Sequence, residues 1–358
     1  MRNPSAVSRP PLCCFFILMV CVCARPSDCI RKRLGVGAFS GVFLCDDAKY
    51  AGAPVALKIF QDVAGCREWA NAEVQILKFL DSSVSPQRSF IQFYNHSQLQ
   101  WKGRTWEAIC YEALGPSLFD FASIHQTRDV PKGFPLECVR TILFQIALTL
   151  AVLHRAGIIH RDIKPENVVL KDRTAAAHFV GRRVEPVNLE VRLLDFGSAS
   201  FECHSHISNL TLPTTPQYRP PEDLHGSEAW TKAGDMWGLG CLAVELWIGK
   251  ALFDVYEDQE FEQLQLFESV LGRRVPVPAN NRLVMHTRSV HPRPAPLPRL
   301  EELVQEYDLR RFIHRCMEYD TKERITALEA LQHPFLAPVA TTTLGQEALA
   351  PLKHFLKL

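Results

Sequence analysis

The sequence Ile-Ile-His-Arg-Asp-Ile-Lys-Pro-Glu-Asn-Val-Val-Leu occupies residues 158–170 and is the most informative segment of the chain. It places an aspartate, a lysine and an asparagine at short intervals between two apolar runs. Asp162 can accept a hydroxyl proton, Lys164 can neutralise a transferred phosphate, and Asn167 can hold a metal ion. Such an ordered set is very improbable by chance. The segment therefore predicts a phosphoryl-transfer site.

A second acidic motif lies further along the chain. Residues 193–197 read Leu-Leu-Asp-Phe-Gly, and Asp195 is the second metal-binding acid that this chemistry needs. Asn167 and Asp195 are thus the expected magnesium ligands. Between the two motifs, residues 171–189 are basic and loop-like, and we expect them to form a surface insertion that the fold does not require.

A glycine-rich segment near the start of the chain is the expected phosphate-binding loop. Glycines let backbone N–H groups approach phosphates without a clash from Cβ. A serine stands where a third glycine would be expected, and we expect this small side chain to be tolerated because the backbone makes the phosphate contacts. The predicted loop residues are Leu34, Gly35, Val36, Gly37, Ala38, Phe39, Ser40, Gly41 and Val42.

Lys58 and Glu73 each occupy an apolar setting that an isolated charge would not tolerate. Lys58 lies at the centre of a predicted strand, residues 55–60, and Glu73 lies on the apolar stripe of a predicted helix, residues 66–80. A lysine at the edge of a sheet could reach solvent, but the buried acid would still need a cation. We therefore expect the two side chains to form an ion pair beside the phosphates.

Strand patterns with one helix dominate from residue 29 to about residue 109, whereas helical periodicity dominates beyond residue 115. The longer apolar helices are expected over residues 136–156, 233–248 and 303–316. This order predicts an α+β protein with a small, mainly β lobe (residues 29–114) and a larger, mainly α lobe (residues 115–336). A leader (residues 1–28) and a C-terminal tail (residues 337–358) flank the two lobes.

With these motifs the chain resembles the eukaryotic protein kinases over residues 29–336. The resemblance implies a bilobal kinase fold, ATP and Mg²⁺ as cofactors, and protein substrates. It also implies catalytic roles for Asp162, Lys164, Lys58 and Glu73. Tyr111 would be the gatekeeper, and Glu112 and Leu114 would receive adenine through their backbone. The base would lie between Val42, Ala56 and Val169, and Arg324 would pair with Glu222.

Within the kinases, the chain resembles the LAMMER (Clk-type) dual-specificity enzymes of the CMGC group. Residues 111–117 resemble their F-E-L-L-G-L-S hinge, and residues 195–200 resemble their D-F-G-S-A-T motif. This implies serine and threonine as acceptors, tyrosine as a further one, Arg/Ser-rich splicing factors as partners, a monomer, and a nuclear or cytoplasmic location. A pseudokinase scaffold is the alternative, but each ionic residue that transfer requires is present.

The activation segment holds candidate regulatory sites. Arg161, beside the catalytic aspartate, can pair with a phosphate group, which indicates control by phosphorylation. Candidate acceptors lie within residues 208–218, notably Thr214 and Thr215, but the sequence does not assign one.

The overall charge does not predict a nucleic-acid partner. Forty lysines and arginines against 39 acidic residues give a formal net charge of +1 in this 358-residue chain. Residues 272–300 are rich in proline and arginine but carry no interleaved aromatic residues, so we interpret them as a solvated insert that docks a substrate or partner. Its arginines are Arg273, Arg274, Arg282, Arg288, Arg293 and Arg299.

The leader has two interpretations. Residues 12–24 are an unbroken apolar and cysteine run that follows Arg2 and Arg9, as in a secretory signal peptide cleaved after residue 24. The run is shorter than the ~20 residues of a membrane span, so no stable span is predicted. Alternatively, the segment is unstructured or a wrongly chosen start. The first interpretation implies a secretory route, whereas the second fits the intracellular chemistry of the rest of the chain.

Overall fold

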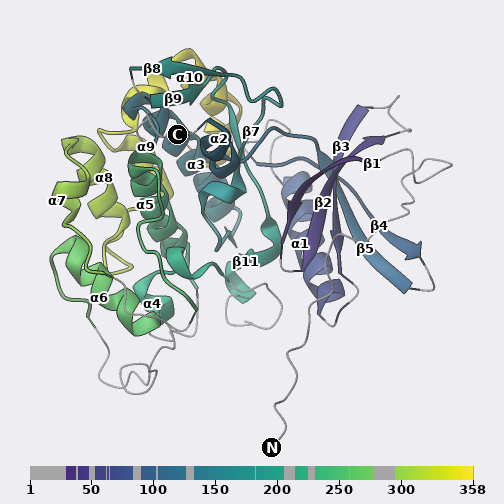
Figure 1. Cartoon of the computed structure of the whole chain (residues 1–358), viewed down its shortest axis with the longest axis horizontal. Coiled ribbons are helices and arrows are strands. Elements are labelled where there is room, and N and C mark those ends of the chain that lie inside the picture. Colours follow the sequence, from purple (N-terminus) through teal and green to yellow (C-terminus); the bar gives the residue numbers. More distant parts are fainter. Residues whose placement is uncertain are drawn as a thin grey trace, which may run out of the picture.

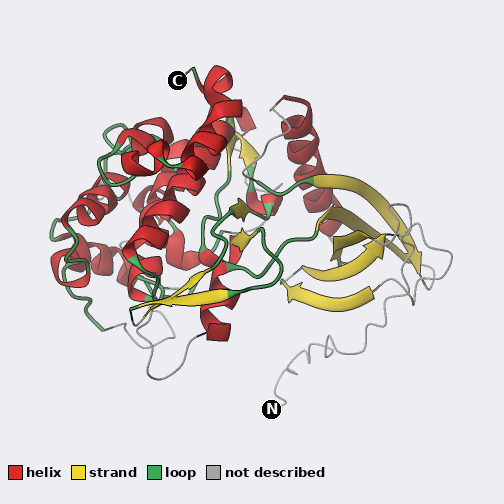
Figure 2. Ribbon diagram, turned by 90° about the horizontal axis from the view of Figure 1, so that it is seen from above, coloured by secondary structure: helices red, strands yellow, loops and turns green. Residues whose placement is uncertain are grey.

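The computed structural model describes residues 30–357, with gaps at residues 38, 48–52, 62, 64, 84–89, 102–103, 126–132, 182, 205–213, 225–229, 258 and 277–294. The leader therefore lies outside the described residues, as does most of the Pro- and Arg-rich insert. The chain forms two lobes that lie side by side, a β-rich N-terminal lobe and a helical C-terminal lobe (Figures 1 and 2).

A five-stranded antiparallel sheet forms the N-terminal lobe, with strand order β1-β2-β3-β5-β4. Its elements are β1 (Ile30–Val36), β2 (Ser40–Asp47), β3 (Ala53–Phe60), α1 (Cys66–Ser83), β4 (Phe93–Trp101) and β5 (Arg104–Glu112). Helix α1 packs against one face of this sheet (Figure 1).

Strand β3 is buried on both faces, which is what its sequence pattern predicts. Val55, Leu57 and Ile59 pack with Leu99 in a small cluster within the sheet. Ala56 faces the other way and belongs to the main core. Because side chains alternate along a strand, Lys58 lies on the same face as Ala56 and thus on the side of α1.

The C-terminal lobe consists mainly of helices, shown in Figure 2. They are α2 (Leu118–His125), α3 (Leu136–Arg155), α4 (Pro221–Leu224), α5 (Lys232–Ile248), α6 (Glu260–Leu271), α7 (Leu300–Leu303), α8 (Tyr307–Cys316) and α9 (Ala327–Gln332). In the described part of the chain, α3 alone has the length and apolarity of a membrane-crossing helix, and 78% of its apolar window is buried inside the protein. Its predicted apolar stripe is the centre of the core.

Short antiparallel strand pairs hold the predicted catalytic segment, residues 158–170, in place. Strand β6 (Ile158–Ile159) pairs with β11 (Ser200–Phe201), and β7 (Val168–Leu170) pairs with β10 (Val191–Leu193). The loop of residues 160–167 therefore leaves β6 and enters β7 at fixed points. This arrangement brings the two motifs of the sequence together.

The insertion between β7 and β10 is more ordered than its composition predicts. Instead of a loop, it contains a hairpin of β8 (Ala177–Val180) and β9 (Arg183–Pro186). Val184 and Pro186 are buried, and Arg183 donates to the carbonyl oxygens of Phe134 and Trp247. Cross-strand pairing and these contacts outweigh the polar composition, so the insertion is packed onto the lobe.

Two further differences lie near the C-terminus. The helix expected over residues 303–316 is divided, because Val304 is extended between α7 and α8. The tail forms α10 (Thr343–Leu349) and α11 (Lys353–Leu356), which are joined by one 3₁₀ turn, Ala350–Leu352. Leu352 and Leu356 are buried, and α11 contacts α3, so the tail packs on the C-terminal lobe.

Candidate active site

The glycine-rich loop connects β1 to β2 as a hairpin, with Gly35 opposite Val42 and Val36 opposite Gly41. The N–H of Gly37 donates to the carbonyl oxygen of Ser40, which tightens the turn. A Cβ added at Gly35 would meet no protein atom within 4 Å. The protein itself does not require a glycine there, so the free space fits a ligand that approaches the backbone. Ala38 lies outside the described residues.

Lys58 brings two acids together at the cleft. Its ammonium nitrogen lies 2.8 Å from Glu73 Oε2 and 2.7 Å from Asp195 Oδ1. The side chains of Lys58 and Glu73 are 7% and 1% exposed, whereas that of Asp195 is 40% exposed. The predicted Lys58–Glu73 pair is therefore present, and Asp195 is the partner whose side chain is open to solvent.

Burial and charge oppose each other in this cluster. Burial alone would lower the pKa of Lys58, but the charges of Asp195 and Glu73 outweigh it, so the pKa is raised. Burial also tends to raise the pKa of Asp195, but Lys58 outweighs it and lowers the pKa to about 2. Burial raises the pKa of Glu73, and Lys58 and the Tyr111 hydroxyl oppose that rise. Lys58 therefore keeps its proton and its positive charge, and Asp195 stays ionised.

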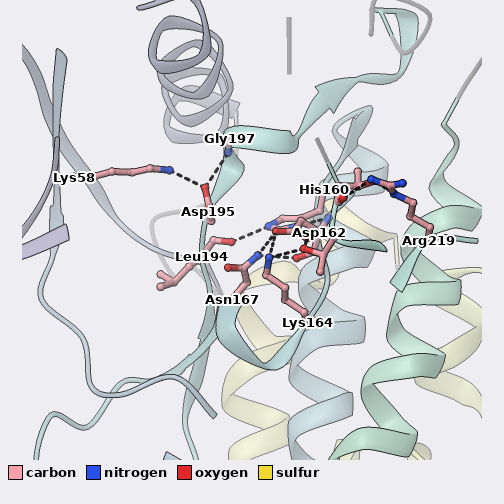
Figure 3. Close-up of polar contacts among 11 residues, drawn as sticks. Lys58, His160, Asp162, Lys164, Asn167, Leu194, Asp195, Gly197 and Arg219 are labelled. Atoms are coloured by element: carbon pink, nitrogen blue, oxygen red, sulfur yellow. Dashed lines mark hydrogen bonds and ion pairs between the residues drawn. The ribbon is translucent and has the colours of Figure 1, made fainter. Parts of the chain in front are cut away.

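The catalytic loop carries a second polar cluster around Asp162 (Figure 3). Lys164 Nζ lies 2.7 Å from Asp162 Oδ2 and donates to Thr215 Oγ1 at 2.6 Å. The Thr215 hydroxyl donates to Asp162 Oδ1 at 2.7 Å. The amide nitrogen of Asn167 donates to both the backbone and the side chain of Asp162, each at 2.8 Å. Asp162 is therefore fixed from three directions.

Asp235 at the start of α5 sets the backbone of this loop. Its carboxylate accepts the N–H of His160 at 2.9 Å and that of Arg161 at 2.7 Å. His160 Nε2 lies 2.9 Å from the carbonyl oxygen of Leu194, the residue before Asp195. This contact connects the loop of residues 160–167 to the segment that carries Asp195, the predicted metal ligand, as Figure 3 shows.

Asn167 and Asp195 fit a divalent cation by the chemistry of their donors. The amide nitrogen of Asn167 is committed to Asp162, so its carbonyl oxygen is the atom left for a metal. Asp195 has a left-handed backbone (φ 60°) and accepts the N–H of Gly197 at 3.2 Å on the same oxygen that contacts Lys58, which fixes the orientation of its carboxylate. An amide oxygen and a carboxylate suit Mg²⁺, which keeps its other ligands as water or phosphate.

The linker between the lobes, residues 112–117, borders the predicted adenine-binding site. The N–H of Gly115 donates to the carbonyl oxygen of Leu170 at 2.8 Å. Ser117 forms an isolated antiparallel backbone pair with Val169. This pairing places Val169 beside the linker. A Cβ at Gly115 would collide with the carbonyl oxygen of Asp172, so a glycine is required at that close approach. Glu112 ends β5, and Leu114 is half-buried against the core.

Some important contacts were not predictable from the sequence. Thr214 and Thr215 are candidate phosphorylation sites, yet both hydroxyls are engaged: Thr214 Oγ1 accepts from Arg219 Nε at 3.0 Å, and Thr215 contacts Asp162. The Tyr111 hydroxyl donates to Glu73 at 2.6 Å, although the sequence indicates only its place at the linker. The predicted Glu222–Arg324 pair is present, with both terminal guanidinium nitrogens on the carboxylate.

Comparisons with known proteins agree with this arrangement. The family profile described as protein kinase domain matches residues 30–336. The dual specificity protein kinase CLK4 of Mus musculus is 32% identical over 348 residues, covering 87% of this chain and 68% of the relative. The serine/threonine-protein kinase AFC2 of Arabidopsis thaliana is 31% identical over 343 residues, covering 86% and 76%. A crystal structure of a kinase domain matches with a TM-score of 0.70 and 23% identity, covering 86% of this chain and 94% of that chain.

Proposed function

Because this chain belongs to the protein kinase family, with CLK and AFC kinases among its relatives, we propose that it transfers the γ-phosphoryl group of ATP to serine and threonine hydroxyls of proteins, and also to tyrosine. Its fold is the bilobal α+β kinase fold that the sequence predicts. The observation that carries the proposal is the joint presence of two polar clusters, one around Lys58 and one around Asp162.

The cluster around Lys58 would hold the nucleotide. Residues 34–42 would cover the phosphates, and Lys58 would exchange its contact with Asp195 for phosphate oxygens. Asn167 and Asp195 would hold Mg²⁺, which neutralises charge on the phosphates. Val42, Ala56 and Val169 would enclose adenine, and the backbone of Glu112 and Leu114 would bond its edge. Glu73 would keep Lys58 in position.

The cluster around Asp162 would act on the acceptor. Asp162 would take the hydroxyl hydrogen bond that Thr215 now makes and orient the nucleophile for in-line attack. Lys164 lies between Asp162 and Thr215, where its charge can stabilise the transferred phosphoryl group. That a threonine hydroxyl lies 2.7 Å from Asp162 supports an aliphatic hydroxyl as the acceptor.

We further propose that substrates are rich in arginine, as in Arg/Ser-rich splicing factors, and that the protein acts in the nucleus or cytoplasm. A cavity of about 820 Å³ adjoins Thr215 and is lined by Glu166, Glu245 and Asp254 as well as Lys250. Even while Glu245 keeps its proton, Glu166 and Asp254 outnumber Lys250, which favours basic side chains next to the acceptor.

The test is transfer of labelled phosphate from ATP to a peptide that contains serine and arginine. We expect turnover by the wild type, and Asp162→Asn should lower kcat roughly 10²–10⁴-fold, as for the loss of a general base. Asp162→Asn should still bind ATP, because Asp162 acts on the acceptor. If the wild type binds ATP but transfers no phosphate to any hydroxyl, the chain is a pseudokinase scaffold and the proposal is wrong.

A further inference from the structure

The hydroxyl of Tyr111 makes a contact that the proposed reaction does not by itself explain. Tyr111 lies near the end of β5 and is 5% exposed. Its hydroxyl donates to Glu73 Oε1 at 2.6 Å, while Lys58 donates to Glu73 Oε2 at 2.8 Å. Both oxygens of this carboxylate are therefore bonded, each by a different strand of the sheet.

Glu73 depends on both donors because it is almost fully buried. A buried carboxylate that loses a donor suffers the full cost of desolvation at that oxygen. Lys58 is also shared, since Asp195 lies 2.7 Å from the same nitrogen. When Lys58 contacts phosphate oxygens, its attraction to Glu73 becomes weaker. The hydrogen bond from the Tyr111 hydroxyl to Glu73 is not shared with the nucleotide and stays in place.

Tyr111 is suited to this task. Burial raises its pKa well above the usual value, and the charge of Glu73 adds to the rise, so the hydroxyl keeps its proton at physiological pH. Its ring lies in the same core cluster as Val74 and Leu77 of α1, the helix that carries Glu73. The LAMMER hinge has phenylalanine at the corresponding place, so the hydroxyl distinguishes this chain from that pattern.

We propose that Tyr111 is a positioning residue for phosphotransfer, whose hydroxyl holds Glu73, and through it Lys58, in the geometry that the reaction requires. The inference deepens the proposed function and rests on it. Tyr111 does not touch the reacting atoms. Because the contact of Lys58 with the phosphates should be strongest in the transition state, misplacing Lys58 should lower kcat more than it raises the KM for ATP.

The test begins with Tyr111→Phe, which removes the hydroxyl and keeps the ring. A hydrogen bond to a charged group stabilises by roughly a factor of ten to a hundred in equilibrium terms. We therefore expect kcat to fall about 5- to 50-fold, with the KM for ATP changed by less than about threefold. Tyr307→Phe, which removes an exposed hydroxyl on α8, is the matched control and should retain wild-type kcat.

Two additional variants separate positioning from packing. Replacement of Tyr111 by 4-aminophenylalanine restores a donor at the same place, and we expect it to recover most of the lost kcat. In a Glu73→Gln background the bond no longer involves a buried charge. There, Tyr111→Phe should change kcat by less than about twofold, because coupled residues are not additive.

The outcomes distinguish this inference from the proposed function. If the wild type transfers phosphate and Tyr111→Phe is fully active, the inference fails while the proposed function stands. A lowered kcat that 4-aminophenylalanine does not restore, together with a lower melting temperature, would mean that Tyr111 only packs, and would also overturn the inference. A wild type without transfer would overturn both.

Discussion

Lys58 in the N-terminal lobe and Arg324 in the C-terminal lobe are both buried cations, but their surroundings differ. Arg324 is 0% exposed and makes two bonds to Glu222, at 2.6 and 2.9 Å. It also donates to the carbonyl oxygens of Ala233 and Glu318, at 2.8 and 2.7 Å. Lys58 is shared between two acids, and one of them faces the cleft.

This contrast separates a charge that joins parts of the fold from one that, in the proposed function, would serve the reaction. The donors of Arg324 go to fixed neighbours in three segments of one lobe, so the residue joins those segments. Lys58 connects β3, α1 and Asp195, and in the proposed function its contact with Asp195 is exchanged for phosphate oxygens. A buried cation enclosed by fixed partners stabilises the fold, whereas a cation shared with a partly exposed acid can accept a ligand in place of that acid.

The largest effect should follow from Lys58→Met. Loss of one preorganised electrostatic group typically costs roughly 10²–10³-fold in kcat. The fold should survive, because Glu73 keeps the Tyr111 donor and its raised pKa eases uptake of a proton. Peptide phosphorylation and thermal unfolding measure the two effects. Lys171→Met, which removes an exposed lysine, is the control. If Lys58→Met severely lowered the stability without lowering kcat, the roles given to Lys58 and Arg324 would be reversed.

Arg324→Met should show the opposite behaviour. Removal of one partner of a buried ion pair costs about 3–5 kcal/mol, because the other charge stays buried. The free energy of unfolding in urea should fall by this amount. At low temperature, the protein that remains folded should keep kcat within about threefold of wild type. Arg31→Met, at an exposed pair with Asp46, should cost at most about 1 kcal/mol. An Arg324→Met protein as stable as wild type is incompatible with its role.

The smallest effect concerns Glu245, a half-buried acid that accepts a bond from the neutral Tyr218 hydroxyl. Burial raises its pKa from 4.5 to about 7; Tyr218 opposes the rise, and Glu166 adds to it. Between these values the folded protein holds the proton that the unfolded chain has lost, so the contribution to stability falls as the pH rises from about 4.5 to about 7. Above pH 7 Glu245 is ionised in both the folded and the unfolded protein. The full free-energy cost of burying its charge then lowers the stability.

Glu245→Gln removes this penalty. The melting temperature of the variant, relative to wild type, should rise between pH 4.5 and pH 8 by a few degrees at most. Glu137→Gln, at a side chain that is 72% exposed, should show no such trend. A pH-independent difference between Glu245→Gln and wild type would mean that the residue titrates normally in the folded protein.

The ionic residues of the site could be predicted because each carries local information. Lys58 stands out in an apolar strand, Glu73 on an apolar helix face, and Asp162 within a dense motif. Their pairing follows from the need to neutralise buried charge. The bilobal fold follows from the change in periodicity near residue 115.

The hydroxyl partners could not be predicted. Tyr111 is separated from Glu73 by 38 residues and Thr215 from Asp162 by 53, and neither hydroxyl has a sequence pattern that indicates its partner. The hairpin in residues 171–189 could not be predicted either. The pairing of β8 with β9 and the bond from Arg183 to the C-terminal lobe both depend on tertiary contacts. Polar composition indicated only an exposed loop.

The central claim is that the shared cation and its acids act as one phosphotransfer unit, and a double-mutant cycle in kcat tests it most directly. Lys58→Met, Glu73→Ala and the double variant are measured with the same peptide and saturating ATP. Each single change removes the same ion pair. The kcat of the double variant should therefore be only slightly lower than that of the less active single variant. If the two losses multiply, Lys58 and Glu73 act independently and the account is wrong.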